Sequence, residues 1–414
     1  MLPAGSPLSA WLAWLETLHP NEIELGLERV QSVLERLDIE RPEHVLIVAG
    51  TNGKGSSVAM ASALLHATGL RVGAYTSPHI VDYNERIAIL DGDGSRYAGD
   101  DEIIAAFEQI ESVRDDVPLT YFEYGTLAAA VVFSAARLDA WILEVGMGGR
   151  LDATNAIEPT AALITNVALD HCEWLGEDVE TIAVEKAGVM RPGIPVVYGG
   201  VDVPRAILDH ADAVGARLLL RGRDYDTDGV PRPGLVGDFQ VGNAAAVLAL
   251  LEAAGLQQAT EAELVKSVLP DIQLAGRGQR VNADGADWLL DVAHNPAAAG
   301  VLAATLAGDG HTSRTLAVIA MLDDKDVEST VGALDEHVDL WIATTAQSGR
   351  AIEASELARR IANATSRPCL IGASIDEAME SARREAAGND RILVTGSFYL
   401  VGPVLERLYS RPQS

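Results

Sequence analysis

The chain is poor in cysteine and has no long apolar run. Its two cysteines, Cys172 and Cys369, are too few for a disulfide framework, which predicts free thiols in a reducing compartment. No uninterrupted apolar run reaches the roughly 18 residues that a membrane-spanning helix needs. Residues 1–20 contain no Lys or Arg, so they lack the basic start of a secretory signal. These absences predict a cytoplasmic protein without a membrane span.

Basic residues are also scarce. The 414 residues include 31 Lys and Arg against 60 Asp and Glu, which gives a net charge of −29. A surface this acidic repels nucleic acid and anionic lipid, so neither is expected as a partner. The apolar fraction of 48% is that of an ordinary globular protein and excludes a disordered or coiled-coil chain. If the ligands are anions, positive charge must be concentrated at the site.

Two series of short apolar runs alternate with helical patterns, which predicts an α/β fold with mostly parallel sheets. The first series has strands at 45–49, 72–75, 141–145, 161–164 and 196–198, and helices at 9–18, 24–37, 101–113, 125–137 and 241–254. The second has strands at 288–292, 316–319, 340–343 and 392–395, and helices at 295–307, 354–364 and 398–408. Residues 224–237 read as irregular and 276–279 as a hinge. We therefore predict domains at 1–275 and 276–414.

A glycine-rich loop follows the first strand. Residues 50–57 read Gly-Thr-Asn-Gly-Lys-Gly-Ser-Ser and lead into a helix. Backbone N–H groups of such a loop can bind phosphate, and Lys54 could reach the terminal phosphates of a nucleotide. The loop is a variant, because Val48 replaces the first glycine of the usual motif and Gly55 separates Lys54 from Ser56. The alternative is a tight turn with an unrelated lysine.

Polar residues follow two further strands of the first series. Glu144 ends one strand before a glycine run and Arg150, and His171 follows the next. Open α/β sheets bind ligands at the carboxyl ends of their strands, where a carboxylate can hold Mg²⁺ and Arg150 can bind an anion. The alternatives are a solvated glutamate at a strand end and a structural histidine.

Three other residues have less specific surroundings. Lys186 stands beside Glu185 in a helical stretch, a pattern typical of a solvated face. Asp291 and His294 follow the first strand of the second series, where they could contact a ribose, base or phosphate. The alternative is a helix cap before Pro296.

Taken in order, these strings resemble one family. Its members are the bacterial bifunctional folylpolyglutamate synthases/dihydrofolate synthases of the Mur ligase superfamily. The matching strings are 23–30, 48–56, 76–79, 84–86, 119–126, 144–155, 169–171, 174–176, 185–188, 291–296, 324–326 and 396–398. Each string alone is weakly specific, but the ordered set covers nearly the whole chain.

The resemblance implies a P-loop-type ATPase domain followed by a smaller Rossmann-like α/β domain. It implies catalytic roles for Lys54, Glu144, His171 and Lys186, with Lys186 carbamylated, and Mg²⁺ ligands at Ser77, Glu144 and His171. The implied ATP-binding residues are Thr51, Asn52, Gly53, Lys54, Gly55, Ser56, Asn243, Arg277, Asp291 and His294. The implied pteroate-binding residues are Glu24, Leu25, Thr120, Tyr121, Phe122, Glu123, Leu151, Asp152 and Ala153.

The implied reaction joins L-glutamate to the carboxylate of 7,8-dihydropteroate and of reduced folates. ATP would first convert that carboxylate to an acyl phosphate, giving ADP and phosphate, so no side-chain nucleophile is needed. Lys54, Arg86, Arg150, Arg277 and Lys325 would supply the local positive charge. We expect a monomer with small-molecule substrates. The alternatives are a Mur-type ligase for a cell-wall nucleotide precursor and a nucleotide-binding regulatory module without catalysis.

Overall fold

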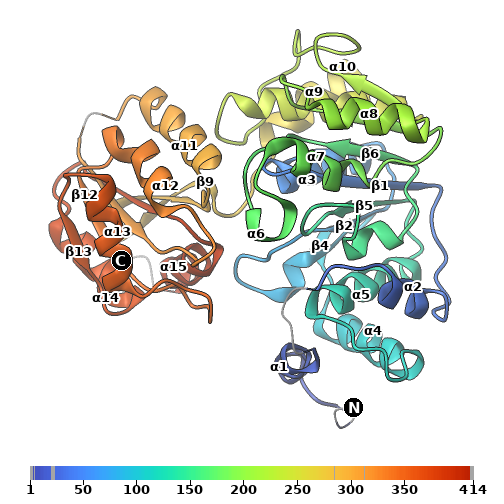
Figure 1. Ribbon diagram of the computed structural model, residues 1–414, viewed down its shortest axis with the longest axis horizontal. Helices are drawn as coiled ribbons and strands as arrows, with labels where there is room; N and C mark the ends of the chain where they lie inside the picture. Colours follow the sequence, from blue (N-terminus) through green and yellow to red (C-terminus); the bar gives the residue numbers. More distant parts are fainter. Residues whose placement is uncertain (1–2, 4, 20–23, 284, 312, 411–414) are drawn as a thin grey trace. The chain divides into compact units, whose positions relative to one another are not determined.

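The computed structural model describes residues 3, 5–19, 24–283, 285–311 and 313–410 (Figure 1). The chain forms two compact units. Unit 1 consists of Met1–Pro233 and Val241–Ile272, and unit 2 consists of Gly234–Gln240 and Gln273–Ser414. The segment Gly234–Gln240 thus belongs to unit 2 although it is flanked on both sides by unit 1.

Unit 1 is built on an eight-stranded sheet in the order β4-β3-β2-β5-β1-β6-β7-β8. The six strands from β2 to β8 along this order run parallel, and β3 and β4 form an antiparallel edge. The strands are β1 (His44–Ala49), β2 (Val72–Tyr75), β3 (Ile87–Asp91), β4 (Gly94–Tyr97), β5 (Ala140–Glu144), β6 (Ala161–Ile164), β7 (Pro195–Tyr198) and β8 (Arg217–Leu220).

Helices cover both faces of this sheet, which is why its central strands are apolar throughout. Alternate residues of β1, among them Val45 and Ile47, pack in one core with α1, α4 and α5, whereas α3 packs against β1, β2 and β5 together with α10. The helices are α1 (Leu8–Leu18), α2 (Glu28–Leu34), α3 (Lys54–Ala67), α4 (Asp100–Val113), α5 (Tyr121–Ala135), α6 (Cys172–Leu175), α7 (Val179–Ala187), α8 (Arg205–Val214), α9 (Phe239–Ala253) and α10 (Ala262–Val268). Short 3₁₀ turns are η1 (Tyr83–Arg86), η2 (Ala153–Ala156), η3 (Gln257–Thr260) and η4 (Leu269–Asp271).

Unit 2 contains a six-stranded sheet in the order β13-β12-β11-β14-β10-β9, parallel except for the edge strand β9. Its strands are β9 (Arg277–Ala283), β10 (Ala286–Asp291), β11 (Thr315–Ile319), β12 (Leu340–Ala343), β13 (Cys369–Ile371) and β14 (Arg391–Thr395). Its helices are α11 (Pro296–Gly308), α12 (Val327–Leu334), α13 (Ala354–Ala364), α14 (Ile375–Glu385) and α15 (Phe398–Ser410), with the 3₁₀ turn η5 (Asp335–His337). The predicted α/β class with mostly parallel sheets is confirmed.

Two local predictions were wrong. The helix predicted at 24–37 is shorter, because within the described residues only Glu28–Leu34 is helical. The backbone before it is held elsewhere, since Gly26 N donates to Leu151 O at 3.2 Å. The hinge predicted at 276–279 lies inside unit 2, where Arg277 starts β9 and Gly278 N donates to Asp291 Oδ2 at 2.9 Å.

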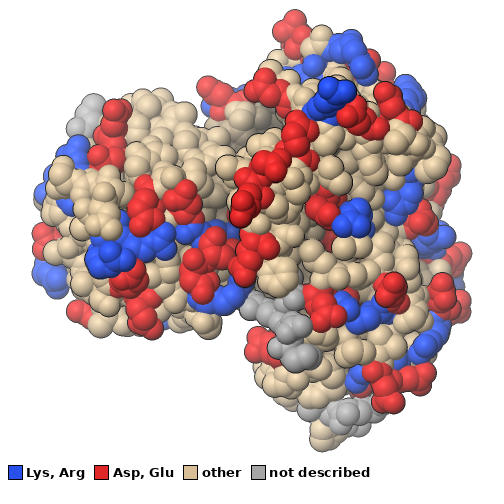
Figure 2. All heavy atoms as spheres, viewed as in Figure 1, with Lys and Arg blue, Asp and Glu red and all other residues tan. Residues whose placement is uncertain are grey.

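The surface of the protein is rich in acidic side chains, as the composition predicts. Acidic side chains are scattered over both units on the face shown in Figure 2, and many lie beside a basic one. Arg71 with Asp139 and Arg359 with Glu356 are examples of exposed ion pairs. No described helix combines the length and the apolar character that a bilayer crossing requires.

Candidate active site

The glycine-rich loop lies between the carboxyl end of β1 and the first turn of α3. Its backbone is held by the segment after β6: Thr51 N donates to Asn166 O and Asn52 N donates to Asn166 Oδ1, both at 3.0 Å. The Lys54 Nζ donates back to Gly50 O at 3.0 Å and to Thr51 O at 3.2 Å. These contacts order the loop at the amino end of a helix, where backbone N–H groups favour an anion.

Asn243 of α9 belongs to the same place. A Cβ built on Gly53 would lie 2.9 Å from Asn243 Nδ2. Gly53 itself has a φ of +85°, a conformation that glycine adopts readily. The structure therefore brings the predicted nucleotide residues Thr51–Ser56 together with Asn243, although nearly two hundred residues of chain separate them.

Glu144 lies buried at the carboxyl end of β5, next to β1 in the sheet. Its Oε2 accepts a hydrogen bond from Ser77 N at 3.2 Å, and a Cβ on Gly55 would lie 3.6 Å from the same oxygen. Two of the three predicted metal ligands are thus neighbours beside the glycine-rich loop.

His171, the third, is the residue before α6, in the segment that follows β6. Its backbone has a φ of +51°, and its N donates to Asp170 Oδ1 at 2.9 Å. Among the described residues no three His, Cys, Asp or Glu side chains are grouped as a metal site. The predicted set is of another kind, because it combines Glu144 and His171 with a serine.

Lys186 does not lie on a solvated face. It sits in the last turn of α7 and is 3% exposed. Burial, and then the positive charge of Lys54, lower the pKa of Lys186 from 10.5 to about 7, while Asp170 and Asp152 act in the opposite direction. No carboxylate of the described residues lies within ion-pair distance of its Nζ. Its neighbour Glu185 instead pairs with Arg150, whose Nη2 lies 2.8 Å from Glu185 Oε1.

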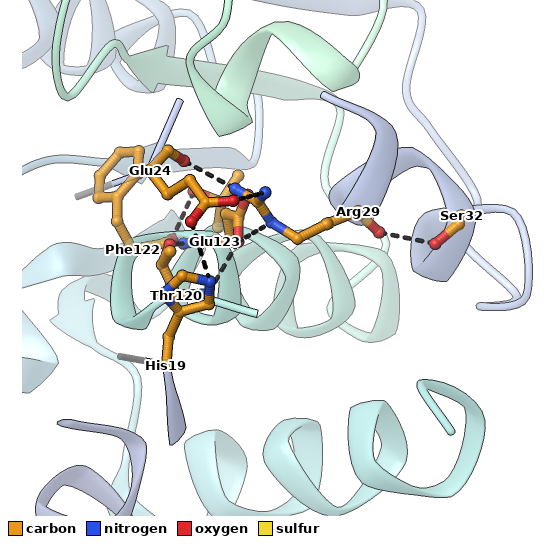
Figure 3. A network of polar contacts seen from close by, with 8 residues as sticks. His19, Glu24, Arg29, Ser32, Thr120, Phe122 and Glu123 are labelled. Atoms are coloured by element: carbon orange, nitrogen blue, oxygen red, sulfur yellow. Dashed lines mark hydrogen bonds and ion pairs between the residues drawn. The ribbon is translucent and has the colours of Figure 1, made fainter. Parts of the chain in front are cut away.

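The three predicted substrate stretches also come together in unit 1. Thr120 caps α5, and Glu123 returns the contact, since its Oε2 accepts from Thr120 N at 2.7 Å. Glu24 lies beside this helix start (Figure 3). The hydrogen bond from Gly26 to Leu151 joins the residues after Glu24, among them the half-buried Leu25, to the third stretch.

Asp152 is fully enclosed. Its carboxylate accepts hydrogen bonds from Thr154 N at 3.0 Å and from Met147 N at 2.9 Å, while desolvation raises its pKa. Ala153, next to it, is also buried. The Phe122 ring packs on the glycine run after β5, since a Cβ on Gly146 would lie 2.6 Å from it. Backbone groups therefore contact both side chains, Asp152 by hydrogen bonds and Phe122 by packing.

Tyr121 belongs to a neighbouring aromatic cluster around Arg86. The Arg86 guanidinium lies 5.4 Å from the ring centre of Tyr83 and 5.6 Å from that of Tyr121. Its Nε donates to His79 Nδ1 at 2.9 Å. Burial, and then Arg86, lower the pKa of His79 to about 4, so His79 is a neutral acceptor at pH 7. This buried cation is one of the predicted positive charges.

The predicted nucleotide residues of unit 2 form a group of their own. Arg277 and Asp291 are partners across β9 and β10, and the Arg277 guanidinium lies 5.3 Å from the Phe398 ring centre. The His294 ring lies 5.8 Å from the same ring. Desolvation raises the pKa of Asp291. Asn295, next to them, is a helix cap that accepts from Ala298 N at 2.8 Å.

Two residues with evident structural importance had no predicted role. Asn166 accepts hydrogen bonds from the glycine-rich loop. Its place just after β6, at the carboxyl end of a parallel strand, is the sequence feature that could have indicated this role. Arg29 contacts both Glu24 and Glu123. It lay within one of the resembling strings, but nothing in the sequence indicated partners 5 and 94 residues away.

Comparison with known proteins agrees with this geometry. The family of the Mur ligase middle domain matches residues 48–192, and that of the Mur ligase glutamate ligase domain matches residues 276–398. A dihydrofolate synthase/folylpolyglutamate synthase of Escherichia coli is 40% identical, covering 99% of this chain and 97% of that protein. The corresponding Haemophilus influenzae protein is 36% identical over 97% of each chain.

Solved structures of such enzymes have the same fold. A structure of Escherichia coli FolC in complex with DHPP and ADP superposes with a TM-score of 0.90 at 38% identity, covering 99% of this chain and 100% of that one. A bifunctional folylpolyglutamate synthase/dihydrofolate synthase with Mn, AMPPNP and L-glutamate bound gives a TM-score of 0.87 at 40% identity, covering 99% of each chain.

The two units and their glycine-rich loop define a ligase of the Mur family, in which a carboxylate is joined to an amino acid. Within that family the chain belongs to the dihydrofolate synthase/folylpolyglutamate synthases. The predicted family, fold class and ligase activity are therefore confirmed. The roles of individual residues remain predictions.

Proposed function

We propose that this chain joins L-glutamate to 7,8-dihydropteroate, and also to reduced folates, with ATP as phosphoryl donor. The observation that carries this proposal is that the glycine-rich loop and the third substrate stretch come after neighbouring strands of one sheet. β1 and β5 are parallel partners, and Glu144 Oε2, at the end of β5, lies 3.6 Å from a Cβ built on Gly55 of the loop. We therefore take the phosphate-binding residues and the pteroate-binding residues to be parts of one site in unit 1.

The nucleotide is assigned to two groups of residues. Thr51–Ser56 and Asn243 would contact it from unit 1, where the ordered loop backbone can bind phosphate oxygens. Arg277, Asp291 and His294 are the nucleotide-contacting residues that we assign to unit 2. We further propose that the functional domains follow the predicted division at 275/276.

The residues around Glu144 fit a divalent cation. Glu144 is a buried carboxylate, an oxygen donor of the kind Mg²⁺ prefers, and Ser77 and the imidazole of His171 would complete the set. When bound, such an ion neutralises phosphate charge. Relatives of this chain have been solved with Mn and AMPPNP bound, which supports the assignment.

The reaction needs positioning more than covalent chemistry from the protein. The γ-phosphoryl group of ATP moves to the substrate carboxylate, so that ADP leaves and an acyl phosphate forms. The glutamate amine then forms a C–N bond to the acyl carbon, the C–O bond to phosphate breaks, and the amine proton goes to solvent. Lys54 stabilises the charge on the transferring group.

Lys186 is proposed to react with CO₂. Only a neutral amine attacks CO₂, and with its pKa lowered to about 7 a large share of Lys186 is neutral at physiological pH. The amine nitrogen forms a bond to the CO₂ carbon and releases a proton, which leaves an anionic carbamate. That carbamate would be a further oxygen donor of the kind that Mg²⁺ prefers.

We also propose that the protein works as a monomer in the cytoplasm. The two cysteines are both free, Cys172 exposed and Cys369 half-buried, as suits a reducing compartment. Analytical ultracentrifugation tests the monomer directly, and a dimeric mass would refute it.

The decisive experiment is ADP release by the purified protein with Mg²⁺, ATP and L-glutamate. Dihydropteroate and tetrahydrofolate are supplied in parallel reactions. We expect turnover with both. Turnover with tetrahydrofolate alone would remove dihydropteroate from the proposal. Turnover with neither would return the cell-wall and regulatory alternatives.

A further inference from the structure

Arg29, in the first turn of α2, has a guanidinium group whose every nitrogen donates to a protein oxygen (Figure 3). Its Nη1 donates to Glu24 Oε1 at 2.6 Å, and its Nη2 donates to Glu24 O at 2.7 Å. Its Nε and Nη2 donate to Glu123 Oε1 at 3.1 and 2.8 Å. These hydrogen bonds use most of the N–H groups of Arg29 on protein oxygens rather than leaving them for a ligand.

Those partners belong to the proposed pteroate site. Glu24 is in the first substrate stretch and Glu123 in the second, at the start of α5. Two residues after Glu24, Gly26 N donates to Leu151 O at 3.2 Å and so reaches the third stretch. The Arg29 contacts therefore connect three segments that lie far apart in the sequence.

Charge explains why an arginine is needed at this position. The Glu123 side chain is only 4% exposed, whereas the side chains of Arg29 and Glu24 are 19% and 40% exposed. A buried carboxylate requires a cation and good hydrogen bonds, and the guanidinium fork supplies both. The same guanidinium also donates from Nη1 to Glu24 Oε1. The other carboxylate oxygen of Glu24, Oε2, lies 3.4 Å from His19 Nε2.

We propose that Arg29 is a positioning residue for the pteroate part of the substrate. It fixes residues 24–26 against the start of α5 and thereby sets their position relative to Leu151, to which Gly26 N donates. The inference rests on the proposed function, because it takes these three stretches to be the pteroate site. It assigns Arg29 no part in ATP binding or in phosphoryl transfer.

The test is steady-state ADP release by Arg29→Ala and Arg29→Lys variants with dihydropteroate, ATP and L-glutamate each varied in turn. Arg29→Ala should raise the KM for dihydropteroate by about tenfold or more, because a misplaced binding group costs affinity. The KM for ATP and the kcat should stay within about twofold of the unmodified protein. Arg29→Lys keeps the positive charge but not the guanidinium fork. Its KM for dihydropteroate should lie between those of the unmodified protein and Arg29→Ala.

Arg36→Ala is the matched control. Arg36 follows α2 and forms an ion pair with Asp115 at 2.9 Å, away from the substrate stretches, so all its kinetic constants should match those of the unmodified protein. If Arg29→Ala does not fold, Arg29→Gln combined with Glu123→Gln removes both charges and keeps hydrogen-bonding groups. This double variant should show the same selective rise in the KM for dihydropteroate.

A Glu24→Ala background separates positioning from general stabilisation. If Arg29 acts through Glu24, then adding Arg29→Ala should raise the KM for dihydropteroate less than it does in the unmodified protein. An unchanged KM for dihydropteroate, or equal rises for dihydropteroate and ATP, would overturn the inference while leaving the proposed function intact. An unmodified protein that does not turn over dihydropteroate would refute the dihydropteroate assignment, and this inference with it.

Discussion

Replacing Lys186 with methionine should make the ligand-free protein more stable at neutral pH, although it removes a residue of the proposed site. Lys186 is 3% exposed, and the positive charge of Lys54 acts on it. Taking an ammonium group out of water without a paired carboxylate is costly, and a thioether of similar length has no such cost.

The magnitude follows from the pKa. Burial lowers the pKa of Lys186 from 10.5 to about 7, so between these two pH values the unfolded chain binds more protons than the folded one. Stability therefore rises with pH across that interval. This shift in pKa lowers the free energy of unfolding by about 5 kcal/mol at and below pH 7. The loss shrinks by about 1.4 kcal/mol for each pH unit above that and vanishes near the ordinary lysine value.

The assay is urea-induced unfolding in metal-free and CO₂-free buffers at several pH values between about 6 and 9.5. At the lowest pH the free energy of unfolding of Lys186→Met should be up to about 5 kcal/mol higher than that of the unmodified protein. This difference should diminish as the pH rises. The control is Lys266→Met: Lys266 is exposed and pairs with Glu263 on α10, so the change should stay within about 0.5 kcal/mol at every pH. A Lys186→Met protein that is less stable at pH 7, or a difference that does not depend on pH, would refute the reasoning.

Three other substitutions test the site. Lys54→Ala should lower the rate of ADP release by about 100-fold or more while the melting temperature changes little, and undiminished activity would contradict the assignment of the phosphate loop. Gly50→Ala should destabilise the protein by about 2–4 kcal/mol in urea, because Gly50 has a φ of +143° and the added methyl would lie 1.8 Å from Thr165 Oγ1; a variant as stable as the parent would show that the loop relaxes. Gly146→Ala should displace the Phe122 ring and raise the KM for dihydropteroate about tenfold with an unchanged KM for ATP, and equal effects on both substrates would point to general distortion.

The buried parallel strands could be predicted from the sequence almost residue by residue. The strands predicted at 72–75 and 161–164 coincide with β2 and β6. A strand covered on both faces is apolar along its whole length, and this signal is local. The edge strands β4 and β13 carry no such signal, because Gly94–Tyr97 and Cys369–Ile371 are largely exposed or half-buried. They were not predicted.

The site divides in the same way. Glu144 and the glycine-rich loop directly follow apolar strands, so the topology of a parallel sheet was enough to predict that they meet. Arg29 and Lys186 depend on partners elsewhere in the fold. The periodic pattern at 24–37 indicated a helix, but the hydrogen bond from Gly26 N to the distant Leu151 O, together with that from Arg29 to Glu24 O, holds the backbone before Glu28 in another conformation. Tertiary contacts here outweigh local propensity.

Like charges close together at Lys54 and Lys186 also bear on how a chain of net charge −29 can bind anionic substrates. A protonated Lys186 would add a buried cation to the half-buried charge of Lys54, which is costly, whereas a neutral Lys186 would add no charge. A carbamate on Lys186 turns the repulsion into an attraction, because the Lys54 ammonium then faces an anion. The positive charge of the loop would therefore favour the proposed modified state, and that state would in turn favour a cation at Glu144. In the proposed arrangement Lys54 would both bind phosphate and favour one charge state of its buried neighbour.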